Sequence, residues 1–298
     1  MASTELQVVA DLLRQLQDGR LDAPLADQRA EWEAASQLFP VPDGAACTPV
    51  RAGNVPAEWV ECPEASGDRV LLYLHGGGYA IGGIATHRHL AARLSSATGA
   101  RVLVLDYRLA PEDPFPAAVD DAVGAFRWIT GQGVALDRLA LVGDSAGGGL
   151  ALAAALARRD RDGTLPAAVV CISPWVDLAL TGESMRARVD REIVLTPDWL
   201  VARARDYVGP GDPRAPLASP LYADLAGLCP LHVVAGTDEI LFDDATRLTD
   251  RAVEAGVDAT LEVFDDCFHL WLVLAPFAPE SVRAVEHLGA YLRPRLGL

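Results

Sequence analysis

A serine between two glycines stands where an apolar segment gives way to an alanine- and leucine-rich one. The pentapeptide Gly143-Asp144-Ser145-Ala146-Gly147 follows residues 139–142 and precedes residues 148–159. The first segment predicts a buried strand and the second a helix, and the glycines permit a sharp turn between them. Such a turn exposes the hydroxyl as a nucleophile for attack on a carbonyl carbon. The alternative is a glycine-rich turn in which Ser145 only caps the helix.

Three consecutive glycines, Gly76 to Gly78, follow a second apolar segment at 70–74, with His75 between them. Without side chains, the backbone N–H groups of such a loop can converge on one point and stabilise an oxyanion. The alternative is a phosphate-binding turn, whose Gly-x-Gly-x-x-Gly pattern fails here because Ile81 stands where the third glycine belongs. The loop therefore favours an oxyanion hole.

Two further apolar segments lead to side chains that could activate the serine. Residues 231–235 precede Asp238, and residues 260–264 precede a loop with His269. If these strands are parallel, Ser145, Asp238 and His269 meet at one edge of the sheet, where ligands bind in open α/β folds. Asp238 is preferred to Asp243, the alternative, because Asp243 falls inside a predicted helix.

Five ordered motifs resemble the hormone-sensitive-lipase branch of the α/β-hydrolases, the bacterial family IV carboxylesterases. The likeness extends from about Arg69 to the C-terminus, and the sequence departs from the family at Glu239, where proline usually follows the aspartate. The resemblance implies an α/β-hydrolase fold and a serine esterase. The motifs are His75 to Gly78, Asp106 to Glu112 (Asp-Tyr-Arg-Leu-Ala-Pro-Glu), Gly143 to Gly147, Asp238, and Phe268-His269.

The motifs and the resemblance together give each residue an expected role. Ser145 attacks an ester carbonyl, His269 takes its proton, and Asp238 orients the imidazole. Backbone N–H groups of Gly77, Gly78 and Ala146 hold the oxyanion. No metal and no organic cofactor is expected for this chemistry. The residues expected to support these loops structurally are His75, Gly76, Asp144, Tyr107, Arg108 and Glu112.

Strands alternate with helical segments along the chain, which predicts an α/β fold with a mostly parallel sheet and helices on both faces. A chain of 298 residues with 51% hydrophobic content can bury one large core. We expect residues 46–179 and 210–298 to form a single catalytic domain. Residues 1–45, which begin with an amphipathic helical pattern, and residues 180–209 are expected to form a cap, an assignment that rests on the resemblance.

Composition excludes several classes of function. The net charge of −16 argues against binding nucleic acid, which needs clustered cations. All 25 basic residues are arginine, so a P-loop lysine and Schiff-base chemistry are excluded. The N-terminal segment lacks the features of a signal peptide, and no segment is apolar for long enough to cross a bilayer. We therefore expect a cytoplasmic protein without stable membrane insertion.

The five cysteines are scattered, without the spacing of a zinc site, and free thiols are expected in a reducing compartment. Cys267 lies two residues from His269 but shares its loop with that expected base. It is therefore a weaker candidate for the nucleophile than Ser145.

The resemblance implies small to medium acyl esters as substrates. A lactone is an alternative substrate for the same triad, and a receptor that has lost catalysis is a distant alternative. A homodimer could form through the last strand, at 260–264. Apolar residues that could line an acyl or alcohol pocket are Trp32, Leu38 and Phe39, and those near Trp199 and Trp271.

Overall fold

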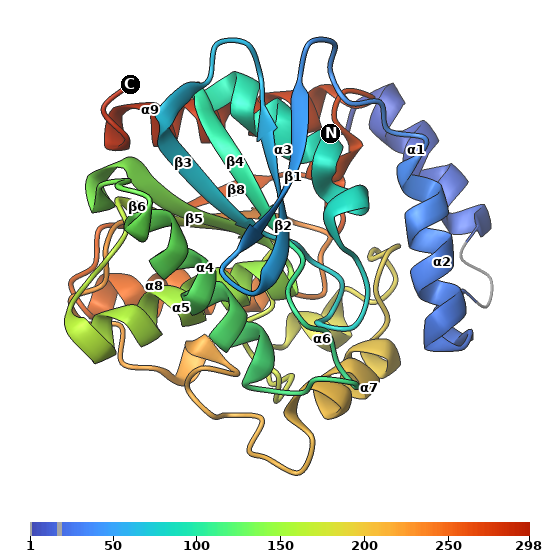
Figure 1. The fold of residues 1–298 in the computed structure, drawn as a ribbon. Coiled ribbons are helices and arrows are strands. Elements are labelled where there is room, and N and C mark those ends of the chain that lie inside the picture. The colour runs from blue at the N-terminus through green and yellow to red at the C-terminus, as the bar shows by residue number, and fades with distance from the viewer. Residues whose placement is uncertain (1, 17–19) are drawn as a thin grey trace.

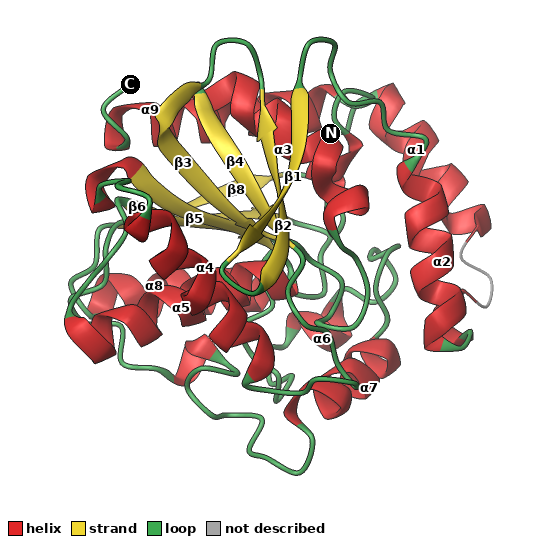
Figure 2. Ribbon diagram, viewed as in Figure 1, coloured by secondary structure: helices red, strands yellow, loops and turns green. Residues whose placement is uncertain are grey.

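The computed structural model describes residues 2–16 and 20–298, and among these residues eight strands form a single sheet (Figures 1 and 2). The spatial order of the strands is β1-β2-β4-β3-β5-β6-β7-β8. The sheet is parallel from β4 to β8, whereas β2 is antiparallel to both β1 and β4. The predicted α/β class is confirmed.

The elements follow one another in the alternation that the sequence predicts. The strands are β1 Ala46–Ala52, β2 Val55–Glu61, β3 Ser66–Leu74, β4 Ala100–Leu105, β5 Leu139–Asp144, β6 Ala168–Ile172, β7 Leu231–Gly236 and β8 Ala259–Phe264. The helices are α1 Thr4–Leu16, α2 Leu25–Ser36, α3 Ile84–Thr98, α4 Ala117–Gly131, α5 Ala146–Asp162, α6 Ser184–Ala187, α7 Pro197–Val208, α8 Phe242–Glu254 and α9 Pro279–Arg295. Short 3₁₀ turns lie at Arg20–Asp22, Leu136–Arg138, Pro220–Tyr222 and Trp271–Leu274.

Two antiparallel strands, β1 and β2, are absent from the sequence prediction. Most residues of β1 are exposed, because this strand lies at the edge of the sheet. Its segment therefore lacks the continuous apolar run that marks the buried parallel strands.

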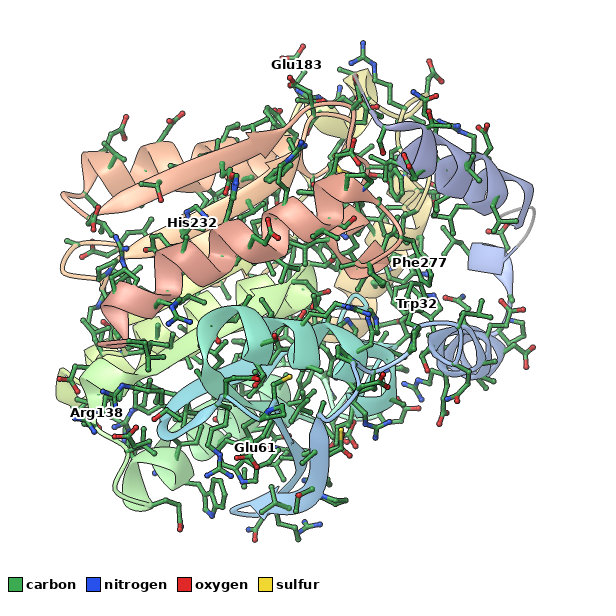
Figure 3. The ribbon with its side chains drawn as sticks, turned by 90° about the horizontal axis from the view of Figure 1, so that it is seen from above. Trp32, Glu61, Arg138, Glu183, His232 and Phe277 are labelled. Carbon is green, nitrogen blue, oxygen red and sulfur yellow. The ribbon has the colours of Figure 1, made fainter. Side chains whose placement is uncertain are left out.

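Each face of the sheet carries its own layer of helices. Leu72 and Leu74 of β3 pack in one core with residues of α4, α5 and α8, whereas Leu71 and Tyr73 pack in another with residues of α3 and α9. Figure 3, viewed from above, shows α3 and α9 lying side by side, and these two helices are in extensive contact. Because successive side chains of a strand point to opposite faces, a strand covered on both faces is apolar throughout.

The two N-terminal helices lie beside this core, at the right of Figure 1, and are tied to it by polar contacts. Arg29 of α2 donates from Nε to the carbonyl of Ala80 at 2.8 Å and from its terminal nitrogens to both carboxylate oxygens of Glu112 at 2.7 Å. The indole N–H of Trp199, on α7, donates to Gln28 Oε1 at 2.9 Å. The two segments expected to form the cap therefore touch each other.

The amphipathic pattern of the first helix reflects partial burial. Leu6 is buried against the core, and Ser3, just before the helix, donates from its backbone N–H to Glu280 at 2.7 Å. Leu12 is half exposed, and the side chain of Leu16 lies outside the described residues. No helix within the described ranges has both the length and the apolarity that crossing a bilayer requires.

The forked contact of Arg29 generates a first prediction. Arg29→Ala should loosen α2 without unfolding the sheet, because it removes hydrogen bonds to two loops while the core stays intact. Hydrogen exchange of the amides in 25–36 should rise about three- to tenfold, the effect of losing one partly exposed charge-assisted contact.

The matched control is Arg14→Ala, because its exposed ion pair with Asp11 lies within α1 and does not involve α2. Unchanged exchange in α2 of the Arg29 variant would contradict the role given to this contact.

Candidate active site

Ser145 occupies a strained turn between β5 and α5. Its φ of 53° and ψ of −122° lie in a region that side-chain-bearing residues rarely adopt. The flanking glycines are required, because a Cβ on Gly143 would lie 2.1 Å from the carbonyl oxygen of Gly147. A Cβ on Gly147 would lie 2.0 Å from the carbonyl oxygen of Leu74. The sequence expectation of a sharp turn that presents the serine is therefore met by the backbone.

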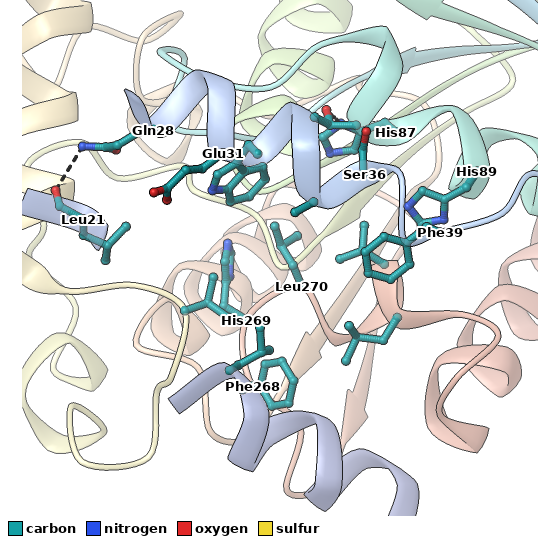
Figure 4. Close-up of a pocket in the computed structure, with 17 residues that line it drawn as sticks. Leu21, Gln28, Glu31, Ser36, Phe39, His87, His89, Phe268, His269 and Leu270 are labelled. Atoms are coloured by element: carbon teal, nitrogen blue, oxygen red, sulfur yellow. Dashed lines mark hydrogen bonds between the residues drawn. The ribbon is translucent and has the colours of Figure 1, made fainter. Parts of the chain in front are cut away.

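The structure brings His269 to the serine, as the sequence predicts. Its Nε2 lies 3.0 Å from Ser145 Oγ, although 124 positions separate the two residues. Figure 4 shows the ring of His269 pointing from its loop into a cavity beneath α2. Both side chains are buried, so water does not compete strongly for this contact.

The carboxylate that contacts His269 is Glu239, and the prediction of Asp238 is wrong. Glu239 Oε2 lies 3.0 Å from His269 Nδ1. Because a carboxylate only accepts, Nδ1 carries the hydrogen and Nε2 is left to accept from the serine hydroxyl. Asp238 instead lies near the surface with its carboxylate 3.7 Å from Arg191.

The turn after β7 explains this one-residue error. The backbone N–H of Asp238 donates to the carbonyl of Cys267 at 3.0 Å, so this residue still borders the neighbouring loop. The next side chain, Glu239, points into the site. The fallback Asp243 is also wrong, because its Oδ2 accepts from the backbone N–H of Ser184 at 2.9 Å. The sequence did contain a signal for the correct residue, because a second carboxylate, Glu239, stands where the family usually has proline.

A serine that the sequence analysis missed forms a hydrogen bond with Glu239, the candidate catalytic carboxylate. Ser173 follows β6, and its hydroxyl donates to Glu239 Oε1 at 2.8 Å. The backbone N–H of Gly236 donates to the same oxygen at 2.5 Å. Glu239 is fully buried, so these two bonds replace the water that its second oxygen would otherwise bind. No motif in the sequence marks Ser173.

The pKa of His269 is raised above that of an ordinary histidine. Burial alone lowers it, but the hydrogen bond and the charge of Glu239, with the charges of Glu192 and Asp144, outweigh that effect. The arrangement therefore favours the protonated, imidazolium form of His269. Burial raises the pKa of the nearby Cys267 thiol, so this thiol stays protonated and is a poor nucleophile.

The triple-glycine loop follows β3 and is fixed from behind. Asp144 Oδ1 accepts from the N–H of Gly76 at 3.0 Å and from the hydroxyl of Tyr73 at 2.6 Å. A Cβ on Gly76 would lie 2.1 Å from Asp144 Oδ2, so only glycine fits there. This agrees with the structural role expected for Asp144. None of the hydrogen bonds within the described chain uses the N–H groups of Gly77, Gly78 or Ala146 as donors.

His75 and Tyr107 brace this loop as expected. The ring of His75 stacks on Tyr107 with centroids 4.2 Å apart, and the Tyr107 hydroxyl donates to the carbonyl of His75 at 2.6 Å. His75 Nδ1 lies 2.8 Å from the carbonyl oxygen of Gly76. Burial, with the neighbouring His87, lowers the pKa of His75 to about 3, so its ring stays neutral.

Arg108 and Glu112 are expected to fix the loop that supports the glycine triplet, and each anchors that loop to a helix. Arg108 binds Asp121 on α4, with contacts between 2.8 and 3.1 Å. Glu112 binds Arg29 of α2, which in turn donates to the carbonyl of Ala80 just beyond the loop. The support from Glu112 is therefore indirect and depends on the N-terminal helix.

A mostly apolar cavity of about 200 Å³ opens beside His269, between α2, the start of α3 and the loop at 268–274 (Figure 4). Trp32 and Phe39 line it, as the sequence analysis expects, together with His87 and His89. The expectation fails for Leu38, which is largely exposed. Near Trp271, which is itself enclosed in the core, Leu270, Val273 and Leu274 line the cavity as expected. Trp199 packs over Gly78, outside the lining of this cavity.

Within the described part of the chain, no group of three His, Cys, Asp or Glu side chains could hold a metal ion.

Comparisons with known proteins agree with this geometry. Residues 71–273 match the family described as alpha/beta hydrolase fold. The chain is 46% identical to an acetyl-hydrolase of Streptomyces hygroscopicus over 300 residues, covering 100% of this chain and 99% of that protein. It is 32% identical to an esterase of Acinetobacter venetianus, covering 86% of this chain and 84% of that one.

Solved structures show the same likeness over the whole chain. An esterase from the bacterial hormone-sensitive lipase family superposes with a TM-score of 0.95 at 46% identity, with 100% of both chains covered. An esterase/lipase from an uncultured bacterium gives a TM-score of 0.94 at 38% identity, again with full coverage of both chains.

The choice between the two adjacent carboxylates is open to a direct test. Glu239→Gln should slow the labelling of Ser145 by a fluorophosphonate about a thousandfold or more, because the amide no longer stabilises the imidazolium. Asp238→Asn removes a charge one position away but no contact to His269, and it should change the rate by less than about threefold. Stopped-time labelling read by intact-protein mass gives both rates.

The opposite ranking, with Asp238→Asn slow and Glu239→Gln near the wild-type rate, would restore Asp238 as the residue that orients His269.

Proposed function

The chain belongs to the alpha/beta hydrolase fold family, in its bacterial hormone-sensitive-lipase branch, and we propose that it hydrolyses esters through Ser145, His269 and Glu239. The protein is a serine carboxylesterase. The single observation that carries the catalytic assignment is the continuous buried contact from Glu239 through His269 to Ser145, with both distances at 3.0 Å.

In the proposed first step, Ser145 Oγ attacks the ester carbonyl carbon while His269 Nε2 takes the hydroxyl proton. The carbonyl electron pair moves onto oxygen and gives a tetrahedral oxyanion. When that intermediate collapses, the bond to the alcohol oxygen breaks and His269 donates its proton to the leaving alcohol. Water then attacks the acyl-enzyme by the same route, which releases the acid and restores the serine.

We assign the oxyanion to the backbone N–H groups of Gly77, Gly78 and Ala146. Supporting this, the three groups make no hydrogen bond within the described chain, and they flank the nucleophile from two different loops. Removing one donor of this kind typically costs about 3 kcal/mol of transition-state stabilisation.

We propose small to medium acyl esters as substrates. The cavity beside His269 is at the small end for ligand sites, and its walls are mostly apolar. Two relatives carry names that point to short acyl groups, the acetyl-hydrolase and an ethyl acetate hydrolase of Pseudomonas putida, which is 34% identical over 234 residues.

The alternatives expected from the sequence are less well supported. A lactone would need the same residues, but the named relatives are esterases and acetyl-hydrolases. A receptor that has lost catalysis would have no need for an aligned serine, histidine and carboxylate, and all three are present.

We also propose that the segments at 1–45 and 180–209 form a cap over the site, supported by the contact of Trp199 with Gln28 and by the cavity lining. A homodimer through β8, which lies at the edge of the sheet, and a cytoplasmic location stay predictions.

Loss of the nucleophile should abolish the proposed activity. Ser145→Ala should reduce the hydrolysis of p-nitrophenyl acetate and butyrate by at least about a thousandfold, because no other group can form the acyl-enzyme. The measurement is release of p-nitrophenol, with circular dichroism to show that the variant is folded.

The matched control is Ser66→Ala, at the opposite end of the parallel strands, which should keep wild-type turnover. Undiminished hydrolysis by the folded Ser145 variant would remove the proposed mechanism.

A further inference from the structure

A second glutamate is buried close to the triad but forms no hydrogen bond or ion pair with His269 or Ser145 among the described contacts. Glu192 lies between α6 and α7, and only 8% of the residue is exposed. Its Oε1 accepts from the backbone N–H groups of Ile193 at 2.9 Å and Val194 at 2.7 Å. No arginine or histidine of the described chain forms an ion pair with it within 4.0 Å. The cost of burying this carboxylate is therefore met only by backbone donors and by more distant charges.

The other oxygen of Glu192 faces the turn that carries Glu239. Glu192 Oε2 accepts from the backbone N–H of Ile240, the residue directly after Glu239, at 3.3 Å. The same segment holds this turn at two further points. The hydroxyl of Ser184 donates to the carbonyl of Ile240 at 2.7 Å, and the guanidinium of Arg188 donates to the carbonyl of Thr237. The segment from Ser184 to Glu192 thus holds the turn by hydrogen bonds on both sides of Glu239, the triad carboxylate.

Glu192 also connects this turn to the cavity. Val194, whose N–H it binds, lines the cavity beside His269. One carboxylate therefore joins the wall next to the proposed substrate site to the backbone that positions Glu239.

The charges around Glu192 come from several elements. Glu239 belongs to the turn after β7, and His269 belongs to the loop after β8. Burial raises the pKa of Glu192 to about 7, with the charge of Glu239 also raising it and the charge of His269 lowering it. In turn, the charge of Glu192 is among those that raise the pKa of His269. Asp144 contributes to His269 from the end of β5.

We propose that Glu192 is a positioning residue of the esterase, which fixes the turn bearing Glu239 and, as a second buried carboxylate, stabilises the imidazolium of His269 during acyl transfer. This inference rests on the proposed function. It makes the segment between α6 and α7 part of the machinery that activates Ser145, in addition to its place beside the substrate.

The test is the pH profile of kcat and kcat/KM for Glu192→Gln, Glu192→Asp and the wild type on p-nitrophenyl butyrate. Glutamine keeps an oxygen for the N–H groups of Ile193 and Val194 but removes the charge. We expect Glu192→Gln to lower kcat about tenfold and to leave KM within about twofold. The acidic limb of its kcat profile should move to lower pH by about one unit. Aspartate keeps the charge, so the acidic limb of Glu192→Asp should lie close to that of the wild type.

The control is Asp190→Asn, which removes an exposed negative charge two residues away and should change neither kcat nor the limb. The proposal is overturned if Glu192→Gln has the wild-type pH profile and kcat. It is also overturned if the glutamine and aspartate variants lose activity equally with no movement of the limb, because that pattern indicates a purely structural role.

A measurement on the wild type covers the case in which the variants do not fold. The low-field proton resonance of His269 Nδ1–H should respond to pH in two steps, one for the ring itself and one for Glu192. A single step would contradict the coupling. A wild-type protein that neither hydrolyses the ester nor reacts with a fluorophosphonate would instead reject the proposed function, so the two failures are distinguishable.

Discussion

The contact between Ser145 and His269 depends on five loops that leave the same edge of a parallel sheet. The glycine loop leaves β3, the serine turn leaves β5, Ser173 follows β6, Glu239 follows β7, and His269 follows β8. Each strand is paired in register with its neighbours, and β5, β6 and β7 are buried on both faces, so the loops cannot shift independently. This rigidity keeps a hydroxyl, an imidazole and a carboxylate aligned in a site from which water is largely excluded.

Burial makes this alignment chemically useful and also demanding. A buried imidazolium needs a compensating charge, and a buried carboxylate needs donors for both of its oxygens. Glu239 meets the first need, and Ser173 with the backbone of Gly236 meets the second. Behind the glycine loop, Asp144 Oδ1 accepts from Tyr73 and Gly76, and its Oδ2 lies 3.4 Å from His87 Nε2. The polar groups of the site are thus fixed by neighbours that themselves do no chemistry.

Much of this arrangement can be predicted from the sequence, because it depends on local patterns. The glycines around Ser145 dictate its turn. The apolar runs before Ser145, before His269 and before the glycine loop place these three features at strand ends. The predictions that fail are those that depend on tertiary contacts. Whether Asp238 or Glu239 turns inward is set by a backbone bond to Cys267, and the partner of Glu112 is Arg29, 83 positions away. Ser173 and Glu192 carry no motif, since their roles arise only where separate loops meet.

The most direct test of the triad assignment is a crystal structure of the protein after reaction with diethyl p-nitrophenyl phosphate. The account predicts phosphorus bound to Ser145 Oγ and a phosphoryl oxygen within about 2.7–3.1 Å of the N–H groups of Gly77, Gly78 and Ala146. It also predicts that His269 remains hydrogen-bonded to Glu239. A phosphoryl oxygen directed away from the glycine loop, or a His269 ring that contacts Asp238 in place of Glu239, would contradict it.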